Sequence, residues 1–388
     1  MRNRSIFTIS TIALALCSSM ALAQEDETGF FAKADTTLAH DDNIYRVTDD
    51  LAQSDTYLSI APELKLIGGF GKQRFELAYN GDYAKFGDAS DADYTDHDVR
   101  AKINFDHTLR FTSKFEAGYQ KEHEDPGTIN RIQLNISEYN KYDQNFLLAG
   151  LAYGQESAIG RFALDYRRTE KDYTNNDLDF LDFSSNQYSA RFTYRVAPKT
   201  RLYIESQFTD YNYELVNGFE LDNSYKRYRA GLSWDFTNKL TGDINIGYQD
   251  RDYELETLRD IDGLAYNGEV TWSINTFTKL GFVAKRESID SSLEQTGGFL
   301  RTTYGVSLKH ELSELLKIKA NAGIGNDELV FSSAREDERF AVETILEYSV
   351  LRNLIVAISY SYEQRESTDE LAEYNANVIG LNVIISLD

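Results

Sequence analysis

Hydrophobic and polar residues alternate with a period of two along most of the chain. In the stretch RFELAYNGDYAKF, residues 74–86, Phe75, Leu77 and Tyr79 fall on one side, and polar or small residues fall on the other. Successive strand side chains point to opposite faces, so this pattern predicts a strand with one apolar and one polar face. The alternation recurs as far as residues 354–362, and no convincing 3.6-residue helical period interrupts it.

The connections between these segments alternate between short and long. A sheet whose strands are joined in this order is typical of an outer-membrane barrel, which has short periplasmic turns and long external loops. The expected short turns are 68–72, 106–109, 154–160, 197–200, 237–239, 275–277, 311–314 and 350–353, and the expected long polar loops are 41–54, 87–95, 123–140, 173–185, 212–222, 254–264, 288–298, 326–336 and 366–373.

The number of segments separates two all-β folds. A soluble sandwich buries the apolar faces of two sheets against each other and more naturally stops near about ten strands. Here about 18 hairpin-linked segments fit between the turns, an even number that places both termini on the same side. We therefore expect a transmembrane antiparallel β-barrel of about 18 strands, with both termini periplasmic, long extracellular loops and the apolar faces against lipid.

Two local features refine this expectation. Aromatic residues at the strand ends beside the long loops are expected to form an outer girdle, although each of them is also consistent with packing beneath a loop. Pro62 lies inside the segment 56–66, where it cannot donate a ladder hydrogen bond, so a bulge or a different strand boundary is expected there. The girdle candidates are Tyr83, Phe86, Tyr119, Tyr166, Tyr173, Tyr211, Tyr213, Tyr248, Tyr253, Tyr360 and Tyr362.

The N-terminus has the pattern of an export signal. Arg2 and Arg4 precede an apolar stretch, and Ala21-Leu22-Ala23 is a small-residue cleavage pattern. The predicted division is a cleaved signal peptide, residues 1–23, and one outer-membrane β-barrel, residues 24–388. Lipidation at Cys17 is the alternative, but the residue before it is a poor match.

Charge and cysteine content limit the partners. The formal charge is −23, so nucleic acid, which needs a basic surface, is not an expected partner. Cys17 is the single cysteine and is lost with the signal, so the mature chain has no thiol for a disulfide or a metal site. No run of about 18 apolar residues follows the signal, which excludes a helical membrane span.

The sequence gives little support for catalysis. The five histidines are scattered, and no H-E-x-x-H or G-x-S-x-G motif occurs. We expect no enzyme activity, no cofactor and no dedicated metal site. Acidic loops at 40–50, 87–96 and 175–182 are consistent with divalent-cation binding, but also with loops kept soluble by their charge.

The polar faces of the segments are expected to line the lumen, and they carry both signs of charge. An arginine ladder on neighbouring strands can steer an anionic solute, whereas opposite charges that pair across strands only hold the wall together. Both interpretations stay open. The predicted pore-lining residues are Arg74, Glu76, Arg100, Lys102, Arg191, Arg195, Arg227, Arg229, Lys317 and Lys319.

The N-terminal half contains several distinctive phrases: DDNIYR at 41–46, the stretch from SDTYLSIAPELKL to GDYAKF at 54–86, DYTDHDVRAKINFD at 93–106 and KEHEDPG at 121–127. Through these phrases it resembles the putative beta-barrel porin type 2 family of outer-membrane proteins. Pro62 falls where that family commonly has a proline. Members are often associated with exopolysaccharide or capsule secretion, so the resemblance implies a partner, a periplasmic polysaccharide export protein without its own membrane span.

Three functions follow as hypotheses. The first is a passive conduit for exopolysaccharide of a capsule or biofilm matrix, in which the loop 123–140 folds inward as a plug. The second is a general diffusion porin for small solutes, and the third is a non-conducting surface or adhesion barrel. In each case the expected location is the Gram-negative outer membrane, with the lipid bilayer, lipopolysaccharide and the barrel-assembly machinery as partners.

Overall fold

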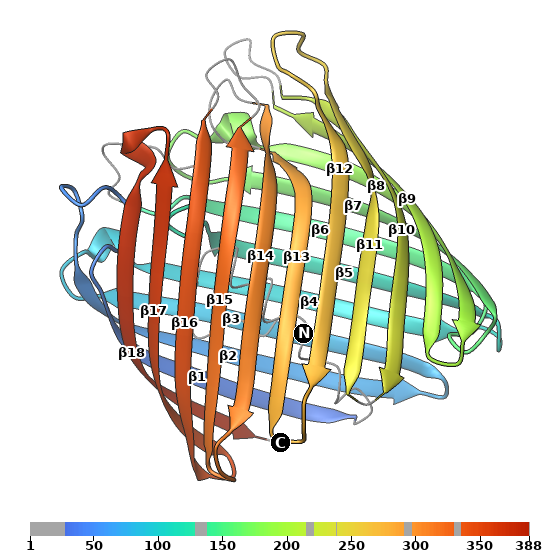
Figure 1. Ribbon diagram of the computed structural model, residues 1–388, viewed down its shortest axis with the longest axis horizontal. Coiled ribbons are helices and arrows are strands. Elements are labelled where there is room, and N and C mark those ends of the chain that lie inside the picture. The colour runs from blue at the N-terminus through green and yellow to red at the C-terminus, as the bar shows by residue number, and fades with distance from the viewer. Residues whose placement is uncertain are drawn as a thin grey trace.

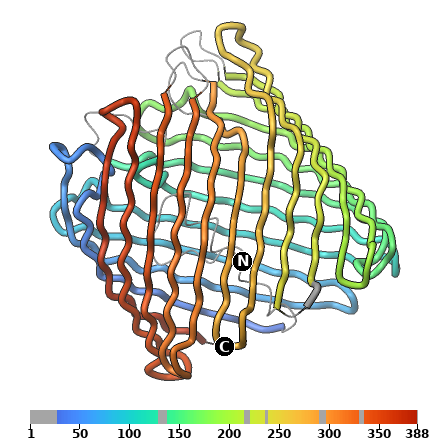
Figure 2. The backbone as a smooth tube through the Cα atoms, viewed as in Figure 1, coloured from blue at the N-terminus to red at the C-terminus, as the bar shows by residue number. Residues whose placement is uncertain are grey.

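The chain forms one closed antiparallel sheet. The computed structural model describes residues 28–128, 138–214, 221–237, 239–290, 297–329 and 335–387. Each strand is hydrogen-bonded to its sequence neighbours, and Figure 2 follows the chain around the wall in this order, from blue to red. The 18 strands are β1 (Gly29–Asp41), β2 (Asp55–Phe70), β3 (Gln73–Phe86), β4 (Tyr94–Asp106), β5 (Phe111–His123), β6 (Lys141–Tyr153), β7 (Gly160–Tyr173), β8 (Phe183–Ala197), β9 (Thr200–Tyr213), β10 (Asn223–Thr237), β11 (Leu240–Tyr253), β12 (Ile261–Ser273), β13 (Thr278–Asp290), β14 (Gly298–Glu311), β15 (Leu316–Leu329), β16 (Glu336–Leu351), β17 (Leu354–Ser367) and β18 (Tyr374–Leu387).

The first and last strands close the barrel. β1 pairs with β18 from Ala32 opposite Leu387 to Asp41 opposite Val378, so neither strand leaves an unpaired edge. In Figure 1 the steep strands of the near wall cross those of the far wall, because closure requires every strand to tilt against the barrel axis. This confirms the expected barrel of 18 strands.

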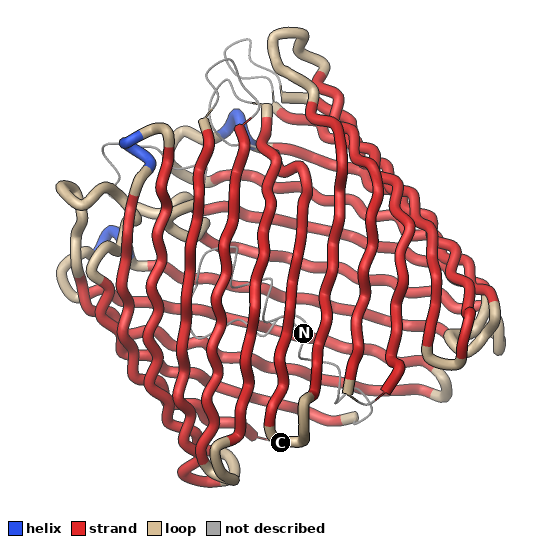
Figure 3. The backbone as a smooth tube through the Cα atoms, viewed as in Figure 1, coloured by secondary structure: helices blue, strands red, loops and turns tan. Residues whose placement is uncertain are grey.

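Short and long connections occupy opposite rims, as the sequence predicts. The turns after the even-numbered strands from β2 to β16 are short, and the connections after the odd-numbered strands are longer. Three helical turns, η2 (Ser90–Ala92), η3 (Asp179–Leu181) and η4 (Glu370–Ala372), all belong to the longer connections and lie on one rim in Figure 3. In the described part of the chain, no helix has the length and hydropathy needed to cross a membrane.

The barrel is apolar outside and polar inside. Large apolar side chains stand exposed on the outer face, and Leu147 and Ile204 are each 61% exposed. On the inner face, polar side chains such as Gln249 and Asn382 are fully buried. A protein in water has the reverse arrangement, and a closed sheet in lipid satisfies its backbone hydrogen bonds internally, so hydrocarbon is the environment that suits this outer face.

The predicted aromatic girdle is only partly correct. Tyr83, Tyr119, Tyr166, Tyr248, Tyr360 and Tyr362 share the parity of the exposed apolar residues and face outward. The other five have the opposite parity, because each is an odd number of residues from the outward set of its strand. Among these five, Tyr173 and Tyr253 are buried beneath the loops with Leu181 and Leu258. The inward-facing candidates are Phe86, Tyr173, Tyr211, Tyr213 and Tyr253.

Pro62 does not produce the expected bulge. The register between β2 and β3 is the same on both sides of it, from Ile60 opposite Tyr83 to Glu63 opposite Asn80. Pairing with β3 is only interrupted at Ala61 and Pro62, because proline has no N–H to donate. Gly81 lies at the matching position of β3, and a side chain there would crowd the Pro62 ring. The glycine thus accommodates the proline without a register shift.

Candidate functional site: the interior of the barrel

All ten predicted pore-lining residues lie at inner positions of their strands. Each has the opposite parity to the exposed apolar residues of the same strand, for example Arg74 and Glu76 beside Phe75 and Leu77. They do not form one site. Arg74, Glu76, Arg100 and Lys102 lie on β3 and β4, Lys317 and Lys319 on β15, and Arg191, Arg195, Arg227 and Arg229 on β8 and β10. That they line an open pore stays a prediction.

The strands β8, β9 and β10 bring the arginines of the ladder together. Glu205 of β9 lies between Arg191 and Arg229 and forms an ion pair with each. The Arg191 guanidinium also lies over the Tyr203 ring, 4.4 Å from its centre, and the Tyr203 hydroxyl donates to Asp243 at 2.6 Å. This part of the wall therefore combines paired charges with an aromatic ring. For Arg191 and Arg229, two of the four arginines, this agrees with the interpretation that opposite charges pair across strands.

The other two arginines of the ladder have no carboxylate partner among the described residues. Arg227 donates to the side-chain oxygen of Gln207 at 2.8 Å. Arg195 lies directly opposite Arg201 in the β8–β9 register, and the Arg201 side chain donates to the backbone carbonyl of Glu156 at 2.9 Å. The ladder is thus only partly neutralised.

A cavity of about 760 Å³ opens at the short-turn rim, which is the periplasmic rim of outer-membrane barrels. The turns near Lys72, Leu109 and Gln155 border it, and Arg191 and Glu205 close its inner side. Along its wall, Lys114 of β5 and Asp165 of β7 form an ion pair of 2.9 Å over Gly150 of β6. Its lining mixes both charges with hydroxyl and amide groups, a surface that suits hydrated polar ligands.

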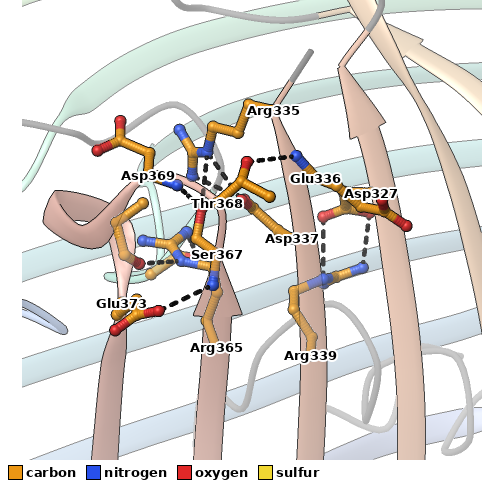
Figure 4. Close-up of polar contacts among 12 residues, drawn as sticks. Asp327, Arg335, Glu336, Asp337, Arg339, Arg365, Ser367, Thr368, Asp369 and Glu373 are labelled. Atoms are coloured by element: carbon orange, nitrogen blue, oxygen red, sulfur yellow. Dashed lines mark hydrogen bonds and ion pairs between the residues drawn. The ribbon is translucent and has the colours of Figure 1, made fainter.

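The opposite rim holds a cluster of buried and half-buried charges, called here the mouth cluster: Arg301, Asp327, Arg335, Asp337, Arg339 and Arg365. Figure 4 labels all of these residues except Arg301. Asp327 accepts two hydrogen bonds from Arg301, at 2.8 and 2.9 Å, and one from Arg339 at 3.0 Å. Asp337 accepts two from Arg335, each of 2.7 Å, and one from Ser367 at 2.6 Å. Bidentate pairs of this kind fix both partners in one geometry.

Arg365 of the mouth cluster holds the loop after β5 against β17, six strands away around the wall. Its Nη1 donates to the carbonyls of Gly127 and Thr128 at 3.2 and 3.4 Å, and its guanidinium lies over the Tyr374 ring. β5 and β17 lie on different sides of the wall, so residues 124–128 cross the mouth rather than follow the rim. Residues 124–128, at the start of the predicted plug 123–140, therefore turn toward the lumen. Residues 129–137 of the predicted plug lie outside the described residues.

The first loop is anchored at the same place. Arg46 forms ion pairs with Asp41 at 2.7 Å and Glu363 at 3.4 Å. Burial alone lowers the pKa of Arg46, but Asp41 and Glu363 outweigh it and raise that pKa above its usual value. Arg46 therefore stays charged and ties the loop after β1 to β17.

The acidic loops use their carboxylates within the protein. Asp42 accepts hydrogen bonds from the backbone N–H and the side-chain amide of Asn377 at 2.7 and 2.8 Å, and Asp182 accepts one from the backbone N–H of Tyr173 at 2.6 Å. Among the described residues, no group of three or more His, Cys, Asp or Glu is arranged to hold a metal ion. These contacts favour a structural role over cation binding.

Comparison with known proteins identifies the family. Residues 30–387 match the family described as "Putative beta-barrel porin 2". The chain belongs to this family. It is therefore an outer-membrane β-barrel of the porin type, as the resemblance of its N-terminal half predicts, and the match extends over almost the whole chain. No curated protein is a detectable sequence relative of it.

Solved porins of Pseudomonas aeruginosa have a similar fold. OccK2 (OpdF) aligns with a TM-score of 0.52 and 12% identity over 92% of this chain and 98% of its own. OpdO gives 0.51 and 13% over 92% and 97%, and opdK gives 0.51 and 12% over 92% and 99%. At such low identity the likeness concerns the fold alone.

The mouth cluster was not predicted from the sequence. Arg335 directly precedes β16, and the other five residues lie on β14 to β17, where each by itself looks like an ordinary charge on the polar face of a strand. Their position was the signal from which the cluster could have been found. Arg301, Asp327, Arg339 and Arg365 all lie at inner positions close to the loop ends of neighbouring strands.

Proposed function

We propose that this barrel is the outer-membrane conduit through which an exopolysaccharide of a capsule or biofilm matrix leaves the cell, with a periplasmic polysaccharide export protein delivering the polymer. The conduit does no chemistry, and the driving force comes from polymer synthesis upstream. The N-terminal signal of residues 1–23 is proposed to direct the chain to export.

The observation that carries the proposal is the cavity at the periplasmic rim. It lies where a polymer would enter, and hydroxyl, amide and paired charged groups line it rather than a deep apolar pocket. A translocating chain needs many weak contacts so that it can enter and still leave. Amide groups continue along the inner face, where the Gln144 side chain donates to Gln120 at 2.6 Å.

A deletion strain tests this function. Loss of the gene should remove most extracellular polysaccharide and leave polymer inside the envelope, and a copy of the gene on a plasmid should restore export. A strain lacking an unrelated outer-membrane porin is the control for general envelope damage. Unchanged extracellular polymer in the deletion strain would refute the proposal.

The second candidate is a general diffusion porin for small solutes. The observation that favours it is the membership of a family described as a porin. It predicts that liposomes containing the purified barrel swell in small sugars without any partner, whereas a conduit that depends on a partner should swell little.

A further inference from the structure

The inner face of the barrel is electrically uneven. On β8, β9 and β10 the inner positions carry five arginines and two acids, Glu205 and Asp235, a surplus of three positive charges. The chain as a whole, by contrast, has a formal charge of −23. The arginines, called here the arginine track, are Arg191, Arg195, Arg201, Arg227 and Arg229.

The inner positions of the facing wall carry more acids than arginines. The inner positions of β16, β17 and β18 carry two arginines, Arg339 and Arg365, and four acids, Asp337, Glu343, Glu347 and Glu363. In the strand order, β9 and β17 are separated by eight steps around a ring of 18 strands, so the two walls lie nearly opposite. Three of these acids pair with cations outside the three strands, Asp337 with Arg335, Glu347 with Lys319 and Glu363 with Arg46, so this wall carries little unpaired charge. The arginine track is the more positive of the two walls, and an anion in the lumen is attracted to it.

The arginine track is arranged in steps. Arg195 and Arg201 form the level nearest the periplasmic rim, Arg191 and Arg229 meet Glu205 four residues farther along the strands, and Arg227 lies two residues beyond Arg229. Residues two apart on one strand face are about 7 Å apart along the strand. The track therefore offers cations at intervals of about 7 to 13 Å along the path of a polymer.

Part of this charge has no structural partner. Arg195 and Arg201 lie directly opposite each other, an arrangement that destabilises a sheet, and neither forms an ion pair with a carboxylate in the described part of the chain. The Nε atoms of Arg227 and Arg229 are buried without a hydrogen-bond partner. Glu205 alone serves both Arg191 and Arg229. A bound anion would relieve both the repulsion and the unmet donors.

The track also suits a sugar. Arg191 covers one face of the Tyr203 ring, and 43% of its side chain is exposed. Guanidinium groups bind carboxylates through paired N–H donors, and neutral donors such as Gln207 lie beside them. The loop of residues 124–128 is held against β17, on the acidic side, which leaves the arginine track uncovered by these residues.

We propose that the arginine track binds the carboxylates of the transported polymer, so that the polymer is an acidic polysaccharide containing uronic acids. This inference rests on the proposed function and names its substrate class. The polymer passes along β8–β10 while its carboxylates move from one arginine level to the next.

A binding titration tests the inference without depending on export. The purified full barrel in detergent is titrated with oligogalacturonate and with neutral maltohexaose. Oligogalacturonate should bind more tightly, and its affinity should fall as salt rises. In the double variant Arg195→Gln/Arg227→Gln the affinity for oligogalacturonate should fall about fivefold for each arginine removed, because exposed ion pairs are individually weak.

A matched control removes the same charge from the outer face. Arg168 of β7 and Lys226 of β10 face outward and pair with Glu170 and Asp252. The double variant Arg168→Gln/Lys226→Gln should keep wild-type affinity. Equal affinity for both oligosaccharides, no binding of either, or an equal loss in the control would overturn the inference.

The two proposals fail separately. If the deletion strain still exports its polymer but the titration gives the expected preference, the track serves another carboxylate-rich solute and the conduit function is refuted. If the deletion strain stops exporting while the titration gives no preference, the conduit function stands and the acidic polymer is refuted.

Discussion

The two facing walls of the barrel carry the same types of charged residue, but these residues have different roles. On β16–β18 and at the loop end of the neighbouring β15, most charges are buried and paired; Arg365 is 2% exposed and Asp327 is fully buried. On β8–β10 the arginines are only partly buried and partly unpaired. Buried pairs fix one geometry, whereas exposed cations remain available to a ligand. The difference indicates that one wall holds the fold and its loops, and the other faces the cargo.

The largest expected effect comes from breaking the mouth cluster. Asp327→Ala leaves Arg301 and Arg339 buried without their carboxylate, which should lower the free energy of unfolding by about 3–5 kcal/mol. Urea titration of the barrel refolded in lipid vesicles measures this. The neighbouring Glu328 is on the outer face and pairs with Arg286 at 3.3 Å, so Glu328→Ala should cost less than about 1 kcal/mol. Equal losses in the two variants would contradict the structural role of this wall.

The next effect concerns the loop held by Arg365. Gly127 has φ +81°, and a methyl group there would lie 2.6 Å from the Tyr374 hydroxyl. Gly127→Ala should therefore release residues 124–128, at a cost of about 1–3 kcal/mol, and speed hydrogen exchange in this segment. Gly71→Ala is the control, because Gly71 has φ +62° but nothing within 4 Å of the added methyl. If both variants leave exchange at 124–128 unchanged, the loop is not held by this contact.

A third variant sharpens the difference in charge. Glu205→Gln removes the carboxylate between Arg191 and Arg229, so it should raise the preference of the open pore for anions and cost about 1–2 kcal/mol in stability. Reversal potentials in planar bilayers and thermal unfolding measure the two effects. Glu269→Gln removes one inner-face charge for which no ion pair is found among the described residues, so it should shift selectivity in the same direction with a smaller loss of stability.

The smallest effect is a pH response in the loop between β7 and β8. Burial raises the pKa of Asp182 to about 6, and the hydrogen bond from the Tyr173 N–H only partly offsets this. The folded state therefore favours the protonated form, and this contribution is lost as the pH rises through about 6. Residues 174–182 should exchange amide hydrogens faster at pH 7.5 than at pH 5 after correction for the intrinsic rate, and Asp182→Asn should flatten this difference.

Asp93 is the control for that measurement. Burial acts to raise its pKa, but the hydrogen bond from Lys85 and the N–H of Phe86 outweigh it, and the pKa of Asp93 is lowered. Asp93 is therefore ionised throughout this pH range, and exchange near it should not change. A pH response at both loops would indicate a general effect and not the titration of Asp182.

The sequence predicted the barrel because its signal is local. A period of two marks each strand, and parity alone placed Arg74 and Lys317 on the inner face and Phe75 on the outer one. The error in the girdle arose because residues were chosen by their place near the strand ends, without a check of their parity. Tyr173 and Tyr253 lie near the loop ends of their strands but on the inner face. The prediction of a bulge at Pro62 was wrong because Gly81, the residue that accommodates the proline, lies on the next strand.

The chain by itself therefore determined the number of strands, their order and the face of each side chain, because hydrogen bonding to sequence neighbours follows from alternation and turn length. Only the closed structure decided which charges meet. Closure brings Arg46 to Glu363 and Gly127 to Arg365, and it sets β9 opposite β17. Such contacts depend on the curvature and tilt of the whole sheet, and no local pattern of residues encodes them.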